Sequence, residues 1–219
     1  MRAVIIANGE LSPPLSILPS DVLIAADGGA RHCLALGLHP AFVIGDLDSL
    51  SEAEISRLQS GGAQVIQFPT RKDSTDLELA LQHAELLAPD EILIYGALGK
   101  RWDQTIANLL LAGAYPLARI RLVDGDQEIR YLRPRERLLI EGEPGDTVSL
   151  IPLSGDAAGI TTRGLDYPLK DERLSFGSTR GVSNVLLANR LEVTLTQGLL
   201  VCVVIHQPGS PLQEEEHED

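Results

Sequence analysis

The chain has 219 residues, of which 44% are hydrophobic and 22% charged, and its formal net charge is −13. This composition is typical of a globular protein with one large or two small domains. An acidic body repels nucleic acid phosphates, and no apolar run approaches the roughly 18 residues of a membrane helix, so we expect neither partner. The two cysteines, Cys33 and Cys202, indicate no disulfide framework, and the apolar run at residues 3–7 is too short for a signal peptide. We therefore expect a cytoplasmic protein, in which Cys33 lies in a helical stretch and Cys202, inside the apolar run 199–205, is a small buried hydrophobe.

Residues 1–125 alternate β-branched runs with segments of helical period, which is typical of parallel strands joined by crossover helices. An amphipathic helix is expected where Leu77, Ala80 and Ala84 share one face, and further helices are expected at 52–60 and around 107–114. Strands are expected at residues 3–7, 22–26, 42–44, 64–67, 91–95 and 119–123. The first part is thus predicted to be a Rossmann-like α/β domain with a parallel sheet.

From residue 126 the pattern changes to short alternating runs broken by Gly, Pro, Asn and Asp, which predicts an all-β sandwich over 126–207. The runs at 193–196 and 199–201, separated by Gln197-Gly198, are predicted to form a hairpin. The acidic end at 208–219 is predicted to be a solvated, disordered tail. Strands are expected at 129–132, 138–140, 147–151, 159–162, 190–196 and 199–205.

Acidic loops follow two of the expected strands in the first domain. Asp27-Gly28-Gly29 combines a carboxylate with glycines that let backbone approach a ligand near a helix N-terminus. Asp46 and Asp48 stand at i and i+2, and in extended chain their side chains share a face, so both can reach one cation. Each loop has a simpler alternative, in which an aspartate caps the following helix.

A third acidic loop, Lys72-Asp73-Ser74-Thr75-Asp76, precedes the amphipathic helix. Asp73 and Asp76 have nearly the spacing of a capping box, so a helix cap and a cation site both remain open here. Its position favours a cation site, because the loop follows a strand at the same expected sheet edge as Asp46.

A fourth loop joins glycines, two cations and an acid ahead of a helix, in the segment Gly96-Ala97-Leu98-Gly99-Lys100-Arg101-Trp102-Asp103-Gln104. Glycines expose backbone amides to phosphate, and Lys or Arg neutralises charge on a transferred group. The loop lacks the Walker pattern. Trp102 is expected either to stack on a ligand ring or to cover core.

Taken in order, these four loops resemble the thiamin pyrophosphokinase family, and the resemblance continues through segments 164–169 and 174–184. The resemblance implies an α/β nucleotide domain followed by a β-sandwich. It implies transfer of the pyrophosphoryl group of ATP to the hydroxyl of thiamin, giving thiamin diphosphate and AMP. It also implies a homodimer with active sites at the interface.

Matched to this chain, the resemblance implies that Mg²⁺ and the ATP phosphates are held by Asp46, Asp48, Asp73 and Asp76, and that Arg101 joins them as a catalytic residue. The nucleotide is expected at residues of the same loops, which are Asp27, Gly28, Gly29, Lys72, Thr75, Gly96, Gly99, Lys100, Arg101, Asp103 and Gln104. Thiamin is expected at residues of the β domain, which are Tyr167, Ser178, Ser183 and Asn184.

Three positions depart from common family patterns. Lys100 stands where many members have Gly, Gln104 where bacterial relatives often have His, and Tyr167 where animal relatives have Trp. Two alternatives to the family reaction are a pyrophosphokinase for a hydroxymethyl pterin and a non-catalytic nucleotide- or thiamin-binding module. The segment containing Ser183 and Asn184 argues against the pterin enzyme. Four loops that carry charged residues and glycines argue against the binding module, because binding alone requires fewer such groups.

Overall fold

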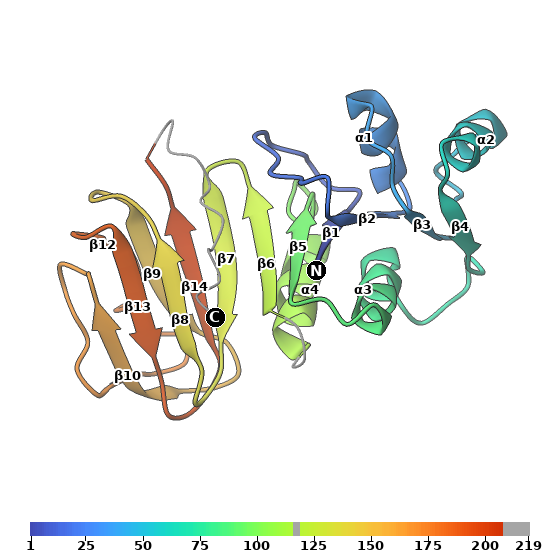
Figure 1. The fold of residues 1–219 in the computed structure, drawn as a ribbon. Coiled ribbons are helices and arrows are strands. Elements are labelled where there is room, and N and C mark those ends of the chain that lie inside the picture. The colour runs from blue at the N-terminus through green and yellow to red at the C-terminus, as the bar shows by residue number, and fades with distance from the viewer. Residues whose placement is uncertain (116–118, 208–219) are drawn as a thin grey trace. The chain divides into compact units, whose positions relative to one another are not determined.

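The computed structural model describes residues 1–115 and 119–207, so the acidic tail predicted at 208–219 lies outside the described residues. The chain divides into two compact units, Met1–Gly125 and Asp126–Asp219. The first unit contains both helices and strands, and the second, over its described part, contains strands joined by loops (Figure 1).

The first unit is built on a parallel sheet in the strand order β6-β5-β1-β2-β3-β4. This confirms the predicted α/β fold class. The central strands β1, β2, β3 and β5 are largely apolar and buried, as expected where helices cover both faces of a parallel sheet, whereas the edge strand β4 has the sequence QVIQ and is partly exposed. Their bounds are β1 Arg2–Ile6, β2 Val22–Ala26, β3 Phe42–Gly45, β4 Gln64–Gln67, β5 Glu91–Tyr95 and β6 Arg119–Asp124.

Four helices connect these strands, and they lie on both faces of the sheet (Figure 1). After β4 the chain returns to the far side of β1, so right-handed crossovers place α1 and α2 on one face and α3 and α4 on the other. The bounds are α1 Gly29–Leu36, α2 Glu52–Ser60, α3 Asp76–Leu86 and α4 Trp102–Ala114. Within the described residues, no helix has both the length and the apolar character needed to span a bilayer.

The strand order reverses between β1 and β5, and this reversal positions the candidate site. The chain leaves β1 toward β2 on one side, whereas β5 and β6 lie on the other. Loops that depart in opposite directions leave a crevice beyond the carboxyl ends of the two strands, which is where open α/β sheets bind ligands.

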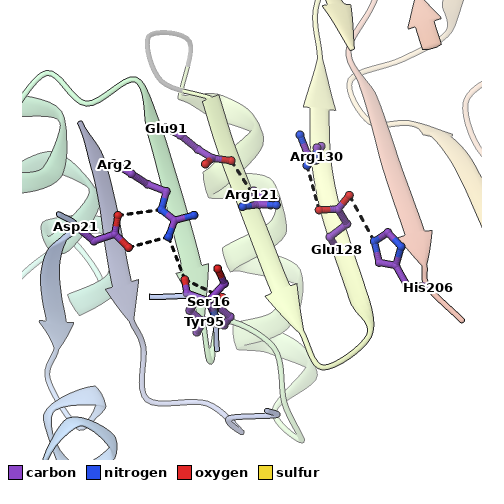
Figure 2. A network of polar contacts seen from close by, with 9 residues as sticks. All are labelled: Arg2, Ser16, Asp21, Glu91, Tyr95, Arg121, Glu128, Arg130 and His206. Atoms are coloured by element: carbon purple, nitrogen blue, oxygen red, sulfur yellow. Dashed lines mark hydrogen bonds and ion pairs between the residues drawn. The ribbon is translucent and has the colours of Figure 1, made fainter. Parts of the chain in front are cut away.

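A buried polar network fastens the segment between β1 and β2 to this sheet (Figure 2). The guanidinium of Arg2 donates two hydrogen bonds to Asp21, at 3.0 and 2.7 Å, and a third to the carbonyl oxygen of Ser16 at 3.2 Å. The hydroxyl of Tyr95 on β5 accepts a hydrogen bond from the backbone N–H of Ser16 at 2.8 Å. Arg2 and Asp21 thus satisfy each other, and removal of either partner would leave the other charge buried and unpaired.

The second unit consists of two antiparallel sheets, ordered β12-β9-β14-β7 and β11-β10-β13-β8. Residues from both sheets, including Leu150, Leu191 and Cys202, form one buried apolar cluster. This arrangement confirms the predicted β-sandwich. The bounds are β7 Gln127–Leu132, β8 Arg137–Glu141, β9 Thr147–Pro152, β10 Ala157–Arg163, β11 Glu172–Leu174, β12 Asn184–Val185, β13 Arg190–Thr194 and β14 Leu200–Ile205.

The hairpin predicted across residues 193–201 is wrong, because β13 and β14 belong to different sheets. β13 pairs with β8 and β10, whereas β14 pairs with β7 and β9. The expected turn residue Gln197 exchanges backbone hydrogen bonds with Ala158 instead. Both strands bury alternate residues in one core, so alternation alone cannot distinguish a hairpin from a connection between the two sheets.

Both cysteines are free and buried, which confirms the burial predicted for Cys202. Burial raises the pKa of the Cys33 thiol and of the Cys202 thiol to about 12 each. Thiols with such high pKa values are inert packing groups at neutral pH.

Candidate active site

A cleft of about 620 Å³ lies at the carboxyl ends of the parallel strands in the first unit. Its lining comes from the loops after β1, β2, β3 and β5, and from the segment that leads into α3. The volume falls within the range of small-molecule sites. The strand reversal between β1 and β5 therefore leaves a cleft large enough for a nucleotide.

Three carboxylates converge in this cleft. Asp27, Asp46 and Asp76 each place one oxygen within 4.8 Å of the others. Asp27 is 7% exposed, and its Oδ1 is buried and makes no hydrogen bond to any described residue. Like charges this close repel one another unless a cation lies among them. The oxygen donors and the unpaired Oδ1 thus fit a hard divalent cation such as Mg²⁺.

The local backbone explains how these carboxylates come together. Asp27 itself adopts the left-handed conformation, with φ 43°, which is uncommon for a residue with a side chain. Gly45, at the end of β3, lets the backbone approach both neighbours, since a Cβ there would lie 2.9 Å from the Asp27 Cβ and 3.0 Å from the Asp76 Oδ1. A larger residue at this position would separate the three groups.

Lys72 supplies a positive charge to the cluster. Its Nζ lies 2.9 Å from the Asp76 Oδ1 and 3.3 Å from the Asp46 Oδ2. Burial by itself lowers the pKa of Lys72, but the two carboxylates outweigh burial and raise it. The pKa of Asp46 is lowered, first by the backbone N–H of Asp48, which donates to its Oδ1, and then by Lys72. One ammonium therefore faces three carboxylates.

Two predicted metal ligands, Asp48 and Asp73, are exposed and lie outside the group of three. Asp48 nevertheless adjoins the group, since its backbone N–H donates to the Asp46 Oδ1 at 3.2 Å. The charge of Asp46, with smaller effects of Asp27 and Asp76, raises the pKa of Asp48. Metal coordination by Asp48 and Asp73 stays a prediction.

The helix caps in the structure test the alternative interpretation, in which the aspartates of the acidic loops cap the helices that follow. The caps are Gly28 for α1, which makes no side-chain cap bond, Ser51 for α2 and Thr75 for α3. The Thr75 Oγ1 accepts a hydrogen bond from the backbone N–H of Glu78 at 3.2 Å. The capping alternative is therefore wrong for Asp27, Asp48 and Asp73, and their carboxylates are left for another role.

The glycine-rich loop after β5 forms another wall of the cleft. Gly96 has φ 66°, and a Cβ there would lie 2.7 Å from the Ala7 carbonyl oxygen. The backbone N–H of Gly9 donates to the Gly96 carbonyl at 2.8 Å, and the buried Asn108 Nδ2 donates to the Ala97 carbonyl at 2.6 Å. The loop is thus held in place by the loop after β1 and by α4.

Two cationic residues at the mouth of the cleft carry acidic partners. The Lys100 Nζ lies 2.9 Å from the Glu10 Oε1. Arg101 donates two hydrogen bonds to Asp103, of 2.6 Å from Nη2 and 3.3 Å from Nε, while Asp103 itself does not line the cleft. Trp102 is 75% exposed, so it does not cover core and stacking on a ligand stays a prediction.

The sequence did not point to one wall of the cleft, which is the loop Asn8-Gly9-Glu10 after β1. This loop also gives a structural reason for the neighbouring glycines, since a Cβ on Gly28 would lie 2.2 Å from the Asn8 Oδ1. Gly28 does not line the cleft, and neither does Gly29, so nucleotide binding by them stays a prediction. Other lining residues that were not predicted include Thr70, Ser74, Leu77, Thr105 and Asn108.

In the second unit, two of the residues expected to bind thiamin are in direct contact. The Asn184 Oδ1 accepts from the Tyr167 backbone N–H at 3.1 Å, and its Nδ2 donates to the Tyr167 carbonyl at 2.8 Å. The side chain of Tyr167 is left 73% exposed. Ser183, next to Asn184, has φ 61°, and its N–H donates to the Ser149 Oγ at 3.1 Å. Asn184 therefore fixes the backbone that presents the aromatic ring.

Comparison with known proteins gives matches in both units. The family model described as thiamin pyrophosphokinase, catalytic domain, matches residues 16–122. The family model described as thiamin pyrophosphokinase, vitamin B1 binding domain, matches residues 135–200. The two matches together span most of the chain. The first includes most of the residues that line the cleft, and the second includes Tyr167 and Asn184.

Individual relatives agree with these matches. The thiamine pyrophosphokinase of Bacillus subtilis is 34% identical over 182 residues, which are 82% of this chain and 85% of the relative. Thiamine pyrophosphokinase 1 of Arabidopsis thaliana is 28% identical and covers 97% of this chain and 89% of the relative. A crystal structure of the Bacillus subtilis enzyme superposes with a TM-score of 0.85 at 32% identity, covering 94% of this chain and 99% of that one.

Proposed function

The chain belongs to the thiamin pyrophosphokinase family, and we propose that it transfers the pyrophosphoryl group of ATP to the hydroxyl of thiamin in the cleft of the first unit. The observation that carries this proposal is the convergence of three carboxylates at the strand reversal, with the Asp27 Oδ1 buried and unpaired. A match to the vitamin B1 binding domain favours thiamin over a pterin alcohol as acceptor.

The proposed Mg²⁺ site uses the residues that the structure brings together. Asp27, Asp46 and Asp76 would hold the ion, and the nearby Asp48 would reach it directly or through water. When bound, Mg²⁺ neutralises phosphate charge and aligns the phosphate chain.

The side chains and backbone of the cleft perform the remaining work. The thiamin hydroxyl oxygen attacks the β-phosphorus of ATP, a new O–P bond forms, and the bond from the β-phosphorus to the α–β bridging oxygen breaks. AMP leaves with that oxygen, and the hydroxyl proton is released. Lys100 and Arg101, which line the cleft, would neutralise phosphate charge, and the glycine-rich loop would offer backbone amides to the phosphates. Alignment and charge neutralisation are the main demands of this reaction.

For thiamin we propose a contact with the exposed ring of Tyr167. Asn184 acts as a positioning residue, since its amide is engaged with the Tyr167 backbone. Ser178 and Ser183 are proposed to add hydrogen bonds to the substrate. A homodimer with the active site at its interface also belongs to the proposal, and sedimentation of the purified protein tests it.

The direct test is release of AMP from ATP by the purified protein with Mg²⁺, with and without thiamin. We expect AMP and thiamin diphosphate in equal amounts, and only when both Mg²⁺ and thiamin are present. A hydroxymethyl pterin supplied in place of thiamin is the matched control. Equal AMP release with the pterin, or none with thiamin, would refute the proposed function.

A further inference from the structure

Lys72 occupies an unusual position for a residue expected to contact phosphate. Its ammonium bridges Asp46 and Asp76, two of the three carboxylates that converge in the cleft. The Lys72 side chain is only 14% exposed, and the two carboxylate side chains are 12% and 28% exposed. The protein itself thus supplies a positive charge that partly offsets the negative charge of the cluster.

This internal cation satisfies the cluster only in part. Its ion pairs reach Asp46 and Asp76, whereas the Asp27 Oδ1 keeps no hydrogen-bond partner among the described residues. A single ammonium also carries one positive charge against three negative ones. A divalent cation in the same place carries twice the charge of the ammonium and can also coordinate the third carboxylate. The three carboxylates therefore attract it more strongly than they attract the ammonium, and we expect it to displace the ammonium.

We propose that Lys72 holds the cation position in the metal-free protein and couples binding of the divalent ion to binding of the nucleotide. This inference rests on the proposed function, because it assumes that Asp27, Asp46 and Asp76 are metal ligands. An ion that binds alone must displace the ammonium and leave it without a carboxylate partner. When ATP is present, the displaced ammonium pairs with phosphate, since Lys72 lines the same cleft.

The consequence is positive cooperativity between the ion and the nucleotide. Each ligand lowers the free-energy cost of binding the other, and by linkage the factor is the same in both directions. Until the ion and the nucleotide are both bound, the ion pairs of Lys72 hold Asp46 and Asp76 together. Without Lys72, the carboxylates bind the ion more tightly on their own and the cooperativity falls.

The test measures Mn²⁺ binding to the full-length, nucleotide-free protein by electron paramagnetic resonance of the free ion, with Mn²⁺ as the probe. For Lys72→Met we expect the Kd for Mn²⁺ to fall by at least about fivefold, within the usual span of coupling factors. A non-hydrolysable ATP analogue should then tighten Mn²⁺ binding less in the variant than in the unchanged protein. Lys72→Gln, with a polar side chain, is a second variant in case Lys72→Met fails to fold.

Lys100→Met is the matched control. Lys100 lines the same cleft and carries the same charge, but it is 89% exposed and pairs with Glu10. We expect less than about a twofold change in the Mn²⁺ Kd, because an exposed charge is screened. Equal tightening in both variants would mean that net charge alone matters and would overturn the proposal, as would an unchanged Kd in Lys72→Met.

Thermal unfolding gives a readout that is independent of turnover. Without added metal, Lys72→Met should lower Tm, because three carboxylates then face one another unbalanced, and Mn²⁺ should restore Tm. If no variant binds Mn²⁺, the metal site and this inference both fail. If Mn²⁺ binds equally to all and thiamin-dependent AMP release persists, the proposed function survives and only the role of Lys72 is lost.

Discussion

Buried carboxylates occur in both units, but their surroundings differ. In the second unit, the His206 Nδ1 lies 2.9 Å from the Asp146 Oδ2, and its Nε2 lies 3.7 Å from the Glu128 Oε1. Glu128 also pairs with Arg130 at 3.2 Å (Figure 2). Asp146 further accepts the backbone N–H groups of Glu143 and Gln207. In the first unit, three carboxylates converge, one ammonium pairs with two of them, and an oxygen of the third, Asp27, has no hydrogen-bond partner among the described residues.

The difference separates a structural acid from a functional one. Burial is common to Asp146 and Asp27, so burial alone does not identify a site. What identifies it is the surplus of negative charge, because a fold gains nothing by crowding carboxylates that it leaves unbalanced. Residues of the balanced cluster should therefore carry stability, and residues of the unbalanced cluster should carry ligand binding.

Asp146→Asn is the strongest test of the balanced cluster. Asp146 is fully buried, and the new amide NH₂ would face a donor in either orientation. The donor is the Gln207 N–H at the Oδ1 position, or the Glu143 N–H and the His206 ring at the Oδ2 position. We expect the free energy of unfolding to fall by about 3–5 kcal/mol, the usual effect of breaking a buried pair. Urea denaturation measures it. A loss below about 1 kcal/mol would show that this cluster is not structural.

The pH dependence of His206 sharpens the same point. Burial alone would lower the pKa of His206, but Glu128 and Asp146 outweigh it, and the pKa is raised. The stabilisation is fully present below the unfolded pKa of about 6.5 and is lost as the pH rises through the folded pKa. His206→Gln should thus cost roughly 1.5–3 kcal/mol at pH 6 and less at higher pH, by urea denaturation across that range.

His83→Gln in the first unit provides a control of opposite sign. Burial lowers the pKa of His83, whose ring packs on Phe42 at 4.3 Å between centroids. The neutral ring is favoured in the folded state, so its contribution is present above pH 6.5 and lost as the pH falls. Parallel pH trends in the two variants would contradict our assignment of charge to His206.

Thr75→Ala tests whether the loop before α3 contributes to folding stability through its helix cap rather than through its aspartates. Removing the hydroxyl that accepts from Glu78 should cost about 1 kcal/mol. Asp73→Asn is the matched control, and since Thr75 holds the cap it should leave the free energy of unfolding unchanged. A larger loss in Asp73→Asn than in Thr75→Ala would restore the capping role for Asp73.

Much of the fold and of the candidate site could be predicted from local sequence patterns. The helical spacing of Leu77, Ala80 and Ala84 predicted α3, because it places apolar side chains on one face. The four polar loops could be placed at strand ends because each follows a short apolar run in the sequence. The loop Asn8-Gly9-Glu10 could not be recognised, because its place beside Gly96 depends on β5 lying next to β1. Strand order is a property of the whole sheet, and no local pattern encodes it.

The finer geometry also depends on contacts between distant segments. The pattern around Gln197-Gly198 predicted a hairpin, yet the choice of sheet for β13 and β14 is made by the shared core. The grouping of Asp27 with Asp46 and Asp76 required the close approach at Gly45. Each residue type was visible in the sequence, whereas its partners were not.

Asp27→Asn should give the smallest change in stability and the clearest change in binding. Asparagine tolerates a positive φ at least as well as aspartate, and the substitution removes one negative charge from the unbalanced cluster. We expect the free energy of unfolding to stay unchanged or to rise by up to about 1 kcal/mol, while Mn²⁺ binding weakens sharply. The control is Asp21→Asn, another buried acid of the same unit, which is paired with Arg2 and should cost several kcal/mol. Equal destabilisation by the two substitutions would mean that the unpaired acid is structural after all, and that surplus charge does not mark the site.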